Sequence, residues 1–239
     1  SVQSHQISFS GGQDKTNYFF SGGYFKEIGT LIETNFDRFS VRGNIDHQVK
    51  KWLRVGFSTN LTRSNQKIGL SDGFDAVTSA VLYNSPAAPI RDVFGNFVGQ
   101  TTIGNNTFGN PRNPVAIASF RDITNTNTKA FGALYGEIAL LKGLTLRNEL
   151  NYDFNLSSDK AFQPFIRNEA TNEDIITPSR LREQRNNSLF WALKNYLSYN
   201  RVFDKHSVGV TLGHESQKSV YDYINASREK LTLNLPSLA

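Results

Sequence analysis

The sequence predicts an all-β fold, an antiparallel transmembrane β-barrel segment of about eight strands with long extracellular loops. Long segments alternate between apolar and polar residues, most are longer than soluble strands, and short and long connections alternate along the chain. In residues 144–155 one parity reads Leu, Leu, Asn, Leu, Tyr, Phe and the other Thr, Arg, Glu, Asn, Asp, Asn. Because successive side chains of a strand point to opposite faces, one face of this segment is apolar and the other is polar.

Eight strands share this alternation, and tight turns join them in pairs. The strands are expected near residues 3–11, 16–26, 35–47, 52–64, 128–141, 144–157, 187–201 and 206–220. The tight turns carry the Gly, Asp and Lys residues that hairpins favour, at 11–15, 48–51, 142–143 and 202–205. The remaining connections are longer, at 27–34, 65–127 and 158–186. Every second connection is therefore short, as in barrels with short periplasmic turns and long extracellular loops.

The loop at about 65–127 is too long to lack structure of its own. A capping segment at 71–73 precedes apolar residues at helical spacing, which predicts a short helix over 73–83. A small hairpin is predicted over 92–98, turning at Gly95-Asn96. Two interpretations stay open: the loop caps a pore or docks a partner, or it packs on itself in water.

A soluble β-sandwich also alternates, with its apolar parity turned inward. Strand length argues against it, because most of the segments run for about 11 to 15 residues whereas soluble strands average about 5 to 6. The placement of aromatic residues points the same way. Those near strand ends share the apolar parity, as in the girdles of a membrane barrel: Tyr18, Tyr24, Tyr152, Phe154, Trp191 and Tyr199.

Composition excludes several classes of protein. No run of about 18 to 20 apolar residues is present, so helical membrane spans are excluded. The net charge of +5 is spread over strands and loops, so we expect no nucleic-acid partner. The absence of cysteine excludes disulfides and cysteine-based metal sites. The chain begins at Ser1 without an initiator methionine or an apolar leader, which predicts an internal piece of a longer protein.

No motif for catalysis is found. His214-Glu215 lacks the second histidine of a zinc-protease helix, and we expect no catalytic residue, metal site or cofactor. Charged residues on the polar parity are predicted to line a hydrated lumen: Arg42, Arg54, Arg147, Glu149, Asp153 and Lys194. Aromatic and polar residues of the long loop are candidate contacts for a substrate or a lid: Tyr83, Phe94, Asn96 and Phe97.

Three segments resemble the SusC/RagA-type family of TonB-dependent outer-membrane transporters. In that family a Ser-Gly-Gly turn leads into a Thr-Asn-Tyr strand, as at residues 10–12 and 16–18 here. A later strand ends in an Asp-x-x-Val-x-x-Trp-Leu-x-x-Gly hairpin, matched by Asp46, Val49, Trp52, Leu53 and Gly56. The loop segment 75–89 is similar as well, so the resemblance is most specific over residues 1 to about 120.

The resemblance implies that residues 1–239 are part of one TonB-dependent receptor β-barrel domain of 22 strands in the bacterial outer membrane, with loops on the cell surface. It implies that the whole protein imports an oligosaccharide or peptide. The expected partners are a SusD-like surface lipoprotein, the outer-membrane lipid around the barrel wall, and a TonB complex that acts through a plug outside this chain. The alternative is a non-transporting structural or adhesive outer-membrane barrel. That barrel could be a small one, because eight strands can close around a side-chain-filled interior.

Overall fold

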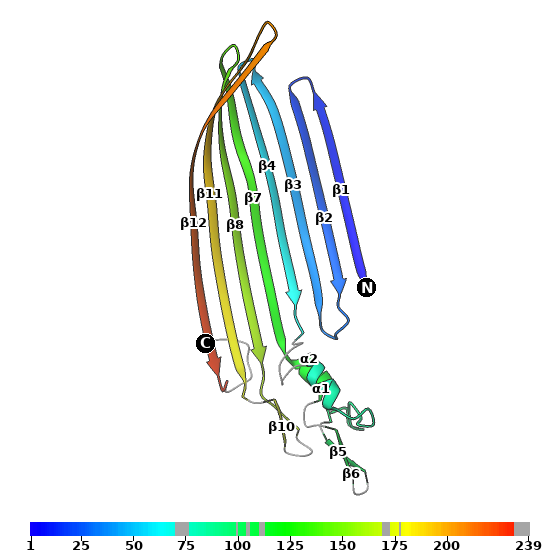
Figure 1. The fold of residues 1–239 in the computed structure, drawn as a ribbon. Coiled ribbons are helices and arrows are strands. Elements are labelled where there is room, and N and C mark those ends of the chain that lie inside the picture. Colours follow the sequence, from blue (N-terminus) through cyan, green and yellow to red (C-terminus); the bar gives the residue numbers. More distant parts are fainter. Residues whose placement is uncertain are drawn as a thin grey trace.

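The computed structural model describes residues 1–69, 77–98, 100–103, 106–109, 113–168, 173–176 and 178–231. Eight long strands form one antiparallel sheet (Figure 1). They are β1 (Val2–Gln13), β2 (Thr16–Ile28), β3 (Asn35–Lys50), β4 (Leu53–Lys67), β7 (Asp122–Leu141), β8 (Leu144–Gln163), β11 (Arg180–Phe203) and β12 (His206–Glu229). The eight predicted strands are therefore confirmed.

Each long strand pairs with the next one along the chain, in the order β1-β2-β3-β4-β7-β8-β11-β12. The four tight turns lie at one end of the sheet, and the helices, the short strands, the N-terminus and the end of β12 lie at the other end (Figure 1). The predicted separation of short turns from long loops is therefore confirmed. The sheet is open, with β1 and β12 as its outer strands.

Several strands run further than the sequence predicts, and the largest extensions are towards the long loops. β7 begins at Asp122 instead of near 128, and β11 begins at Arg180 instead of near 187. These extensions carry polar residues on both faces, so alternation gives no signal there. Their backbones nevertheless keep pairing residue by residue, as Arg180 pairs with Gln163 of β8 and with Glu229 of β12. Hydrogen bonding along the ladder therefore extends the strands beyond the apolar segment.

The turn between β7 and β8 depends on a glycine. Gly143 has a φ of 86°, in the left-handed region that favours glycine. A Cβ there would lie 2.5 Å from the carbonyl oxygen of Asn200 on the neighbouring strand β11. The two-residue turn predicted at 142–143 is therefore confirmed, and both its conformation and its crowding require glycine.

The shorter elements belong to the long connections. They are the helices α1 (Val77–Tyr83) and α2 (Pro114–Phe120) and the two-stranded pairs β5 (Gln100–Ile103) with β6 (Asn106–Gly109) and β9 (Ile166–Asn168) with β10 (Glu173–Ile176). We call residues 77–98 and 113–121 the loop module. The predicted helix is confirmed over Val77–Tyr83, whereas its expected start and cap at 71–76 lie outside the described residues. The sequence did not predict α2.

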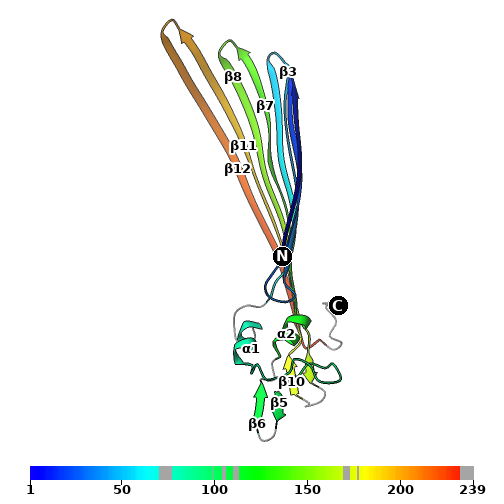
Figure 2. The same cartoon turned by 90° about the vertical axis from the view of Figure 1, so that its right-hand side faces the viewer.

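The sheet is a single curved layer, which Figure 2 shows nearly edge-on. Among the described residues no second sheet packs on it, as a sandwich would require. Large apolar side chains on the strands stay exposed, including Leu134 at 46%, Leu150 at 38% and Leu193 at 39%. Within the described residues, a buried apolar cluster lies in the loop module instead: Val77, Ala80, Ala116, Ile117 and Ala118. The soluble-sandwich alternative therefore has no support in this architecture.

Candidate functional site

The strand register places all six predicted lumen residues on one face of the sheet. Residues directly opposite each other in neighbouring strands share a face. Arg54 lies opposite Glu137, which in turn lies opposite Arg147. Lys194 lies opposite Glu149 on the same side. We call this side the polar face; it carries Arg42, Arg54, Arg147, Glu149, Asp153 and Lys194.

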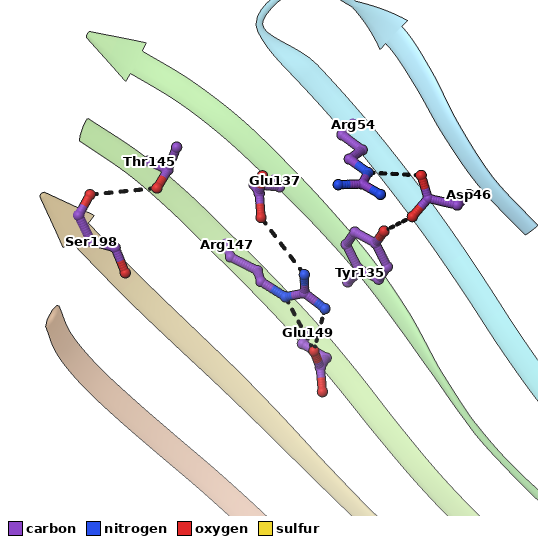
Figure 3. A network of polar contacts seen from close by, with 8 residues as sticks. All are labelled: Asp46, Arg54, Tyr135, Glu137, Thr145, Arg147, Glu149 and Ser198. Carbon is purple, nitrogen blue, oxygen red and sulfur yellow. Dashed lines mark hydrogen bonds and ion pairs between the residues drawn. The ribbon is translucent and has the colours of Figure 1, made fainter. Parts of the chain in front are cut away.

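A belt of ion pairs crosses the polar face near the short turns (Figure 3). Arg54 Nε donates to Asp46 Oδ1 at 2.7 Å, and the Tyr135 hydroxyl donates to the other oxygen of Asp46. Arg147 lies between two carboxylates, 3.6 Å from Glu137 and 2.9 Å from Glu149. Its guanidinium also stacks 3.8 Å from the centre of the Tyr135 ring. The belt therefore joins β3, β4, β7 and β8 through side chains far apart in sequence.

Further pairs continue the pattern across the polar face. Lys129 lies 3.0 Å from Asp153, and Lys194 lies 3.7 Å from Glu215 on β12. Arg42 has a different partner, the ring of Phe19 at 5.8 Å. These side chains are partly exposed, and exposed ion pairs contribute only about 0 to 1 kcal/mol each to stability. What the arrangement provides is a wall of fixed, largely compensated charge suited to water and polar solutes.

The predicted lumen residues do not include Asp46 or Tyr135, which are central to the belt. Alternation does place Asp46 on the polar parity together with Arg42 on β3, but it does not single Asp46 out as a partner of Arg54 and Tyr135. Tyr135 was harder to find, because its partner Asp46 lies 89 residues away and only the register brings the two together.

The opposite side of the sheet, which we call the apolar face, carries the other parity. Its central row pairs Ile45, Phe57, Leu134, Leu150 and Leu193 across β3, β4, β7, β8 and β11. All six predicted girdle aromatics lie on this face: Tyr18, Tyr24, Tyr152, Phe154, Trp191 and Tyr199. The two faces therefore differ in chemistry along most of the sheet, as the alternation predicted.

In the loop module, the four candidate contact residues differ in accessibility. Phe94 is 87% exposed and Tyr83 is 67% exposed, so both rings face outward. Phe97 is only partly exposed, since it packs on the buried cluster and meets Phe120 edge to face at 5.4 Å. Asn96 is held by a hydrogen bond from its amide to Asp92 at 3.2 Å. Two of the four therefore present exposed aromatic surface, and two hold the module together.

The predicted hairpin at 92–98 exists as a tight turn closed by a bridge between Arg91 and Phe97. Asp92 Oδ1 accepts hydrogen bonds from the backbone N–H groups of Phe94 at 2.9 Å and Asn96 at 2.8 Å. Desolvation acts to raise the pKa of Asp92, but the hydrogen bonds from Asn96, Phe94 and Gly95 together lower this pKa below its usual value. The tip that carries Phe94 is therefore an ordered Asx-type turn.

Asn113 connects this turn to α2. Its side-chain oxygen caps the helix by accepting from Val115 N at 3.0 Å and Ala116 N at 3.1 Å. Its side-chain amide donates to the carbonyl oxygens of Ile90 at 2.8 Å and Val98 at 2.6 Å. Asn113 is 1% exposed, so one buried side chain satisfies backbone groups from both ends of the turn and from the helix.

Other kinds of site find no support in the ranges that the structure describes. No group of three His, Cys, Asp or Glu side chains there is arranged to hold a metal ion. Nor is any described helix long and apolar enough to cross a membrane.

An open meander of long strands with one apolar and one charged face, short turns at one end and elaborate loops at the other, has the architecture of a membrane-barrel wall. Comparisons with known proteins agree, although no family model matches the chain. TonB-dependent receptor P3 of Formosa agariphila is 27% identical over 234 residues, which are 91% of this chain and 22% of that protein. TonB-dependent receptor P39 of the same organism is 26% identical over 219 residues, 91% of this chain and 20% of that protein.

Solved structures show the same fold. The RagAB peptide transporter matches with a TM-score of 0.72 and 23% identity, over 96% of this chain and 25% of that one. The RagAB peptide importer in its closed-closed state matches with a TM-score of 0.75 and 24% identity, again over 96% of this chain and 25% of that one. This chain therefore spans about a fifth of the curated relatives and a quarter of the structural neighbours.

These comparisons confirm the resemblance to SusC/RagA-type TonB-dependent receptors that the motifs predicted. The relatives are receptors and transporters, not enzymes.

Proposed function

We propose that the chain forms about eight strands of a larger, 22-stranded outer-membrane barrel and takes part in TonB-dependent import of a nutrient. The observation that carries the proposal is the chemistry of the two faces. Leu134, Leu150 and Leu193 occupy one row of an uncovered apolar face, while Arg147 and Glu149 belong to an ion-pair belt on the other. A sheet with these faces is stable when lipid covers the first and water fills the space beside the second.

The open edges support a wall segment over a complete small barrel. β1 and β12 lie at opposite ends of the strand order, and among the described residues their backbone groups are paired with a strand on one side only. Lipid does not tolerate such edges, so further strands must continue the sheet. The structural or adhesive eight-stranded barrel would instead require β1 and β12 to pair with each other.

Orientation follows from the connections. We infer that the four tight turns face the periplasm and that the loop module and the β9-β10 pair face the cell surface, because bacterial barrels place their long loops outside. The exposed rings of Tyr83 and Phe94 would then contact either an oligosaccharide or peptide substrate or a SusD-like surface lipoprotein. The name of the RagAB peptide transporter supports a peptide as one substrate class. Energy coupling would come from a TonB complex acting on a plug outside this chain.

Deletion of residues 72–112 from the full-length protein tests the functional role. The deletion should abolish uptake of the nutrient or binding of the lipoprotein and leave the barrel folded, because the loop module has its own buried cluster. A matched control, Lys205→Ala in the opposite turn, should leave uptake unchanged. Normal uptake by the deletion variant would show that the loop module only packs on itself.

Protease accessibility in intact cells tests the orientation. Trypsin added outside should spare the bond between Lys50, the last residue of β3, and Lys51, in the turn to β4 at the short-turn end. It should reach the same bond once the envelope is opened. Cleavage there in unbroken cells would contradict the assignment of this end to the periplasm.

A further inference from the structure

The polar face changes character between the short turns and the long loops. Near the turns it carries the ion-pair belt. Nearer the loops, successive rows across β4, β7, β8 and β11 consist of amide and hydroxyl side chains, with Lys129 and Asp159 as the only charged members. We call these rows the amide zone: Thr62, Lys129, Asn155 and Ser188; Ser64, Asn127, Ser157 and Asn186; Gln66, Asn125, Asp159 and Gln184. Each of these strands has a described neighbour on both sides, so the zone does not depend on the open edges of the sheet.

Hydrogen bonds within the amide zone hold its side chains in place. The Asn186 amide donates to Ser157 Oγ at 2.9 Å, and the Asn186 oxygen accepts from Gln184 Nε2 at 2.9 Å. On the neighbouring strand pair, Asn125 Nδ2 donates to Asp159 Oδ1 at 2.5 Å. A primary amide has two N–H donors, and these contacts use one from Asn186 and one from Gln184. Both residues are partly exposed, so each presents a fixed N–H group to a ligand on this face.

Two aromatic rings lie in the row on the turn side of the amide zone. Phe131 and Phe190 are on either side of Asp153, and their backbones are therefore about 10 Å apart, twice the spacing of neighbouring strands. Phe131 is 43% exposed although it belongs to the polar face. Lys129 lies 5.5 Å from the centre of the Phe131 ring and 3.0 Å from Asp153. Apolar ring surface is unfavourable in water, so a ligand with apolar surface of its own would be favoured here.

We propose that the amide zone, together with Phe131 and Phe190, binds an uncharged oligosaccharide, and that the imported nutrient is a sugar and not a peptide. The proposal rests on the import function given above. Sugar hydroxyls both donate and accept, as the amides and hydroxyls of the zone do, and the C–H faces of sugar rings can pack on aromatic rings. A peptide brings ionised termini, which favour partners of opposite charge. The two charges of the zone already have partners, since Lys129 pairs with Asp153 and Asp159 accepts from Asn125.

The test measures which ligands the full-length protein retains. The protein is reconstituted in lipid vesicles and incubated with two pools at equal concentration: neutral oligosaccharides of glucose, galactose, mannose and xylose, and random peptides of similar length. After washing and mild extraction, native mass spectrometry identifies the bound molecules. Members of the oligosaccharide pool should be retained in preference to peptides. Retention of peptides in preference to sugars would overturn the proposal and leave the import function standing.

Substitutions in the wall test the site itself, at equal amounts of folded barrel. Asn186→Ala should reduce oligosaccharide retention by about tenfold, as expected for the loss of one or two hydrogen bonds. Phe131→Ala should also reduce it, whereas Phe131→Tyr keeps the ring and should retain binding. Asn187→Ala is the matched control, because Asn187 is the next residue of the same strand and points to the apolar face.

Three outcomes would overturn the site while leaving the barrel intact. They are wild-type retention of neither pool, retention unchanged by both Asn186→Ala and Phe131→Ala, and equal losses from Asn186→Ala and Asn187→Ala. Failure of the wild-type protein to insert into the vesicles would overturn the proposed function as well.

Discussion

The strand sheet and the loop module are organised by different solvents. In the sheet, Leu134, Leu150 and Leu193 stay more than a third exposed, and no described layer covers them. In the loop module, Ala116 and Ile117 are 0% and 2% exposed, like the core of a small soluble domain. One chain therefore contains a region whose apolar residues need an external apolar solvent and a region that buries its own. The same substitution should have different consequences in the two regions.

The largest expected effect is on the apolar face of the sheet. Leu150→Arg should cost about 2 to 4 kcal/mol of barrel stability, the range for a cation placed on a lipid face near the midplane. Asn151→Arg is the matched control, because Asn151 lies on the polar face and hydrogen-bonds to Glu149 at 3.1 Å. Its penalty should be close to zero. Both variants of the full-length protein are to be unfolded with denaturant in lipid bilayers.

Equal penalties at the two positions would show that the assignment of the faces is wrong. A wild-type protein that folds and stays monomeric in plain buffer would contradict the membrane interpretation altogether.

The sheet was largely predictable from sequence because its physical rule is local. A strand repeats every two residues, so parity alone assigned Arg147 and Glu149 to one face and Leu150 to the other, and the register agrees. Parity could not reveal the partners. The contact between Asp46 and Tyr135 forms only because several strands pair in register. The same holds for Thr59 and Tyr152, whose hydroxyl oxygens are 2.7 Å apart.

The loop module was less predictable because its contacts are neither periodic nor close in sequence. Asn113 follows a stretch rich in Gly, Asn and Thr, and the only local signal for a helix cap is its place before Pro114, a residue favoured at the first position of a helix. Its role depends on the carbonyl groups of Ile90 and Val98, 23 and 15 residues earlier. Phe97 was predicted as an outward contact on residue type alone, and its packing on Phe120 required a helix that the sequence did not predict.

Asn113→Ala should give the second-largest effect, confined to the loop module. It removes a helix cap and leaves two backbone carbonyls without a donor, so local stability should fall by about 1 to 3 kcal/mol. Hydrogen exchange followed by mass spectrometry should show faster exchange over 90–98 and 114–120. The strands β7 and β8 should exchange as in the wild type.

Asn113→Asp separates the two functions of this side chain. The carboxylate can still cap α2, but it cannot donate to Ile90 and Val98, so exchange should accelerate more over 90–98 than over the helix. Unchanged exchange in both variants would show that the buried cluster holds the module together without Asn113.

The smallest expected effect is the pH dependence of the turn that carries Phe94. The pKa of Asp92 is lowered in the folded turn, so the carboxylate stabilises the turn at neutral pH, and this contribution is lost as the pH falls from about 4 through the lowered pKa. Asp92→Asn keeps an oxygen that can accept from Phe94 and Asn96 but does not titrate. The ratio of exchange protection at 92–97 between wild type and Asp92→Asn should therefore exceed one at about pH 6 and approach or fall below one at about pH 3. A ratio that stays constant over this range would show that the ionised carboxylate contributes nothing to the stability of the turn. The order of the tip would then come from Gly95, which has a φ of 89°, and from the guanidinium of Arg91, which stacks 3.8 Å from the centre of the Phe97 ring.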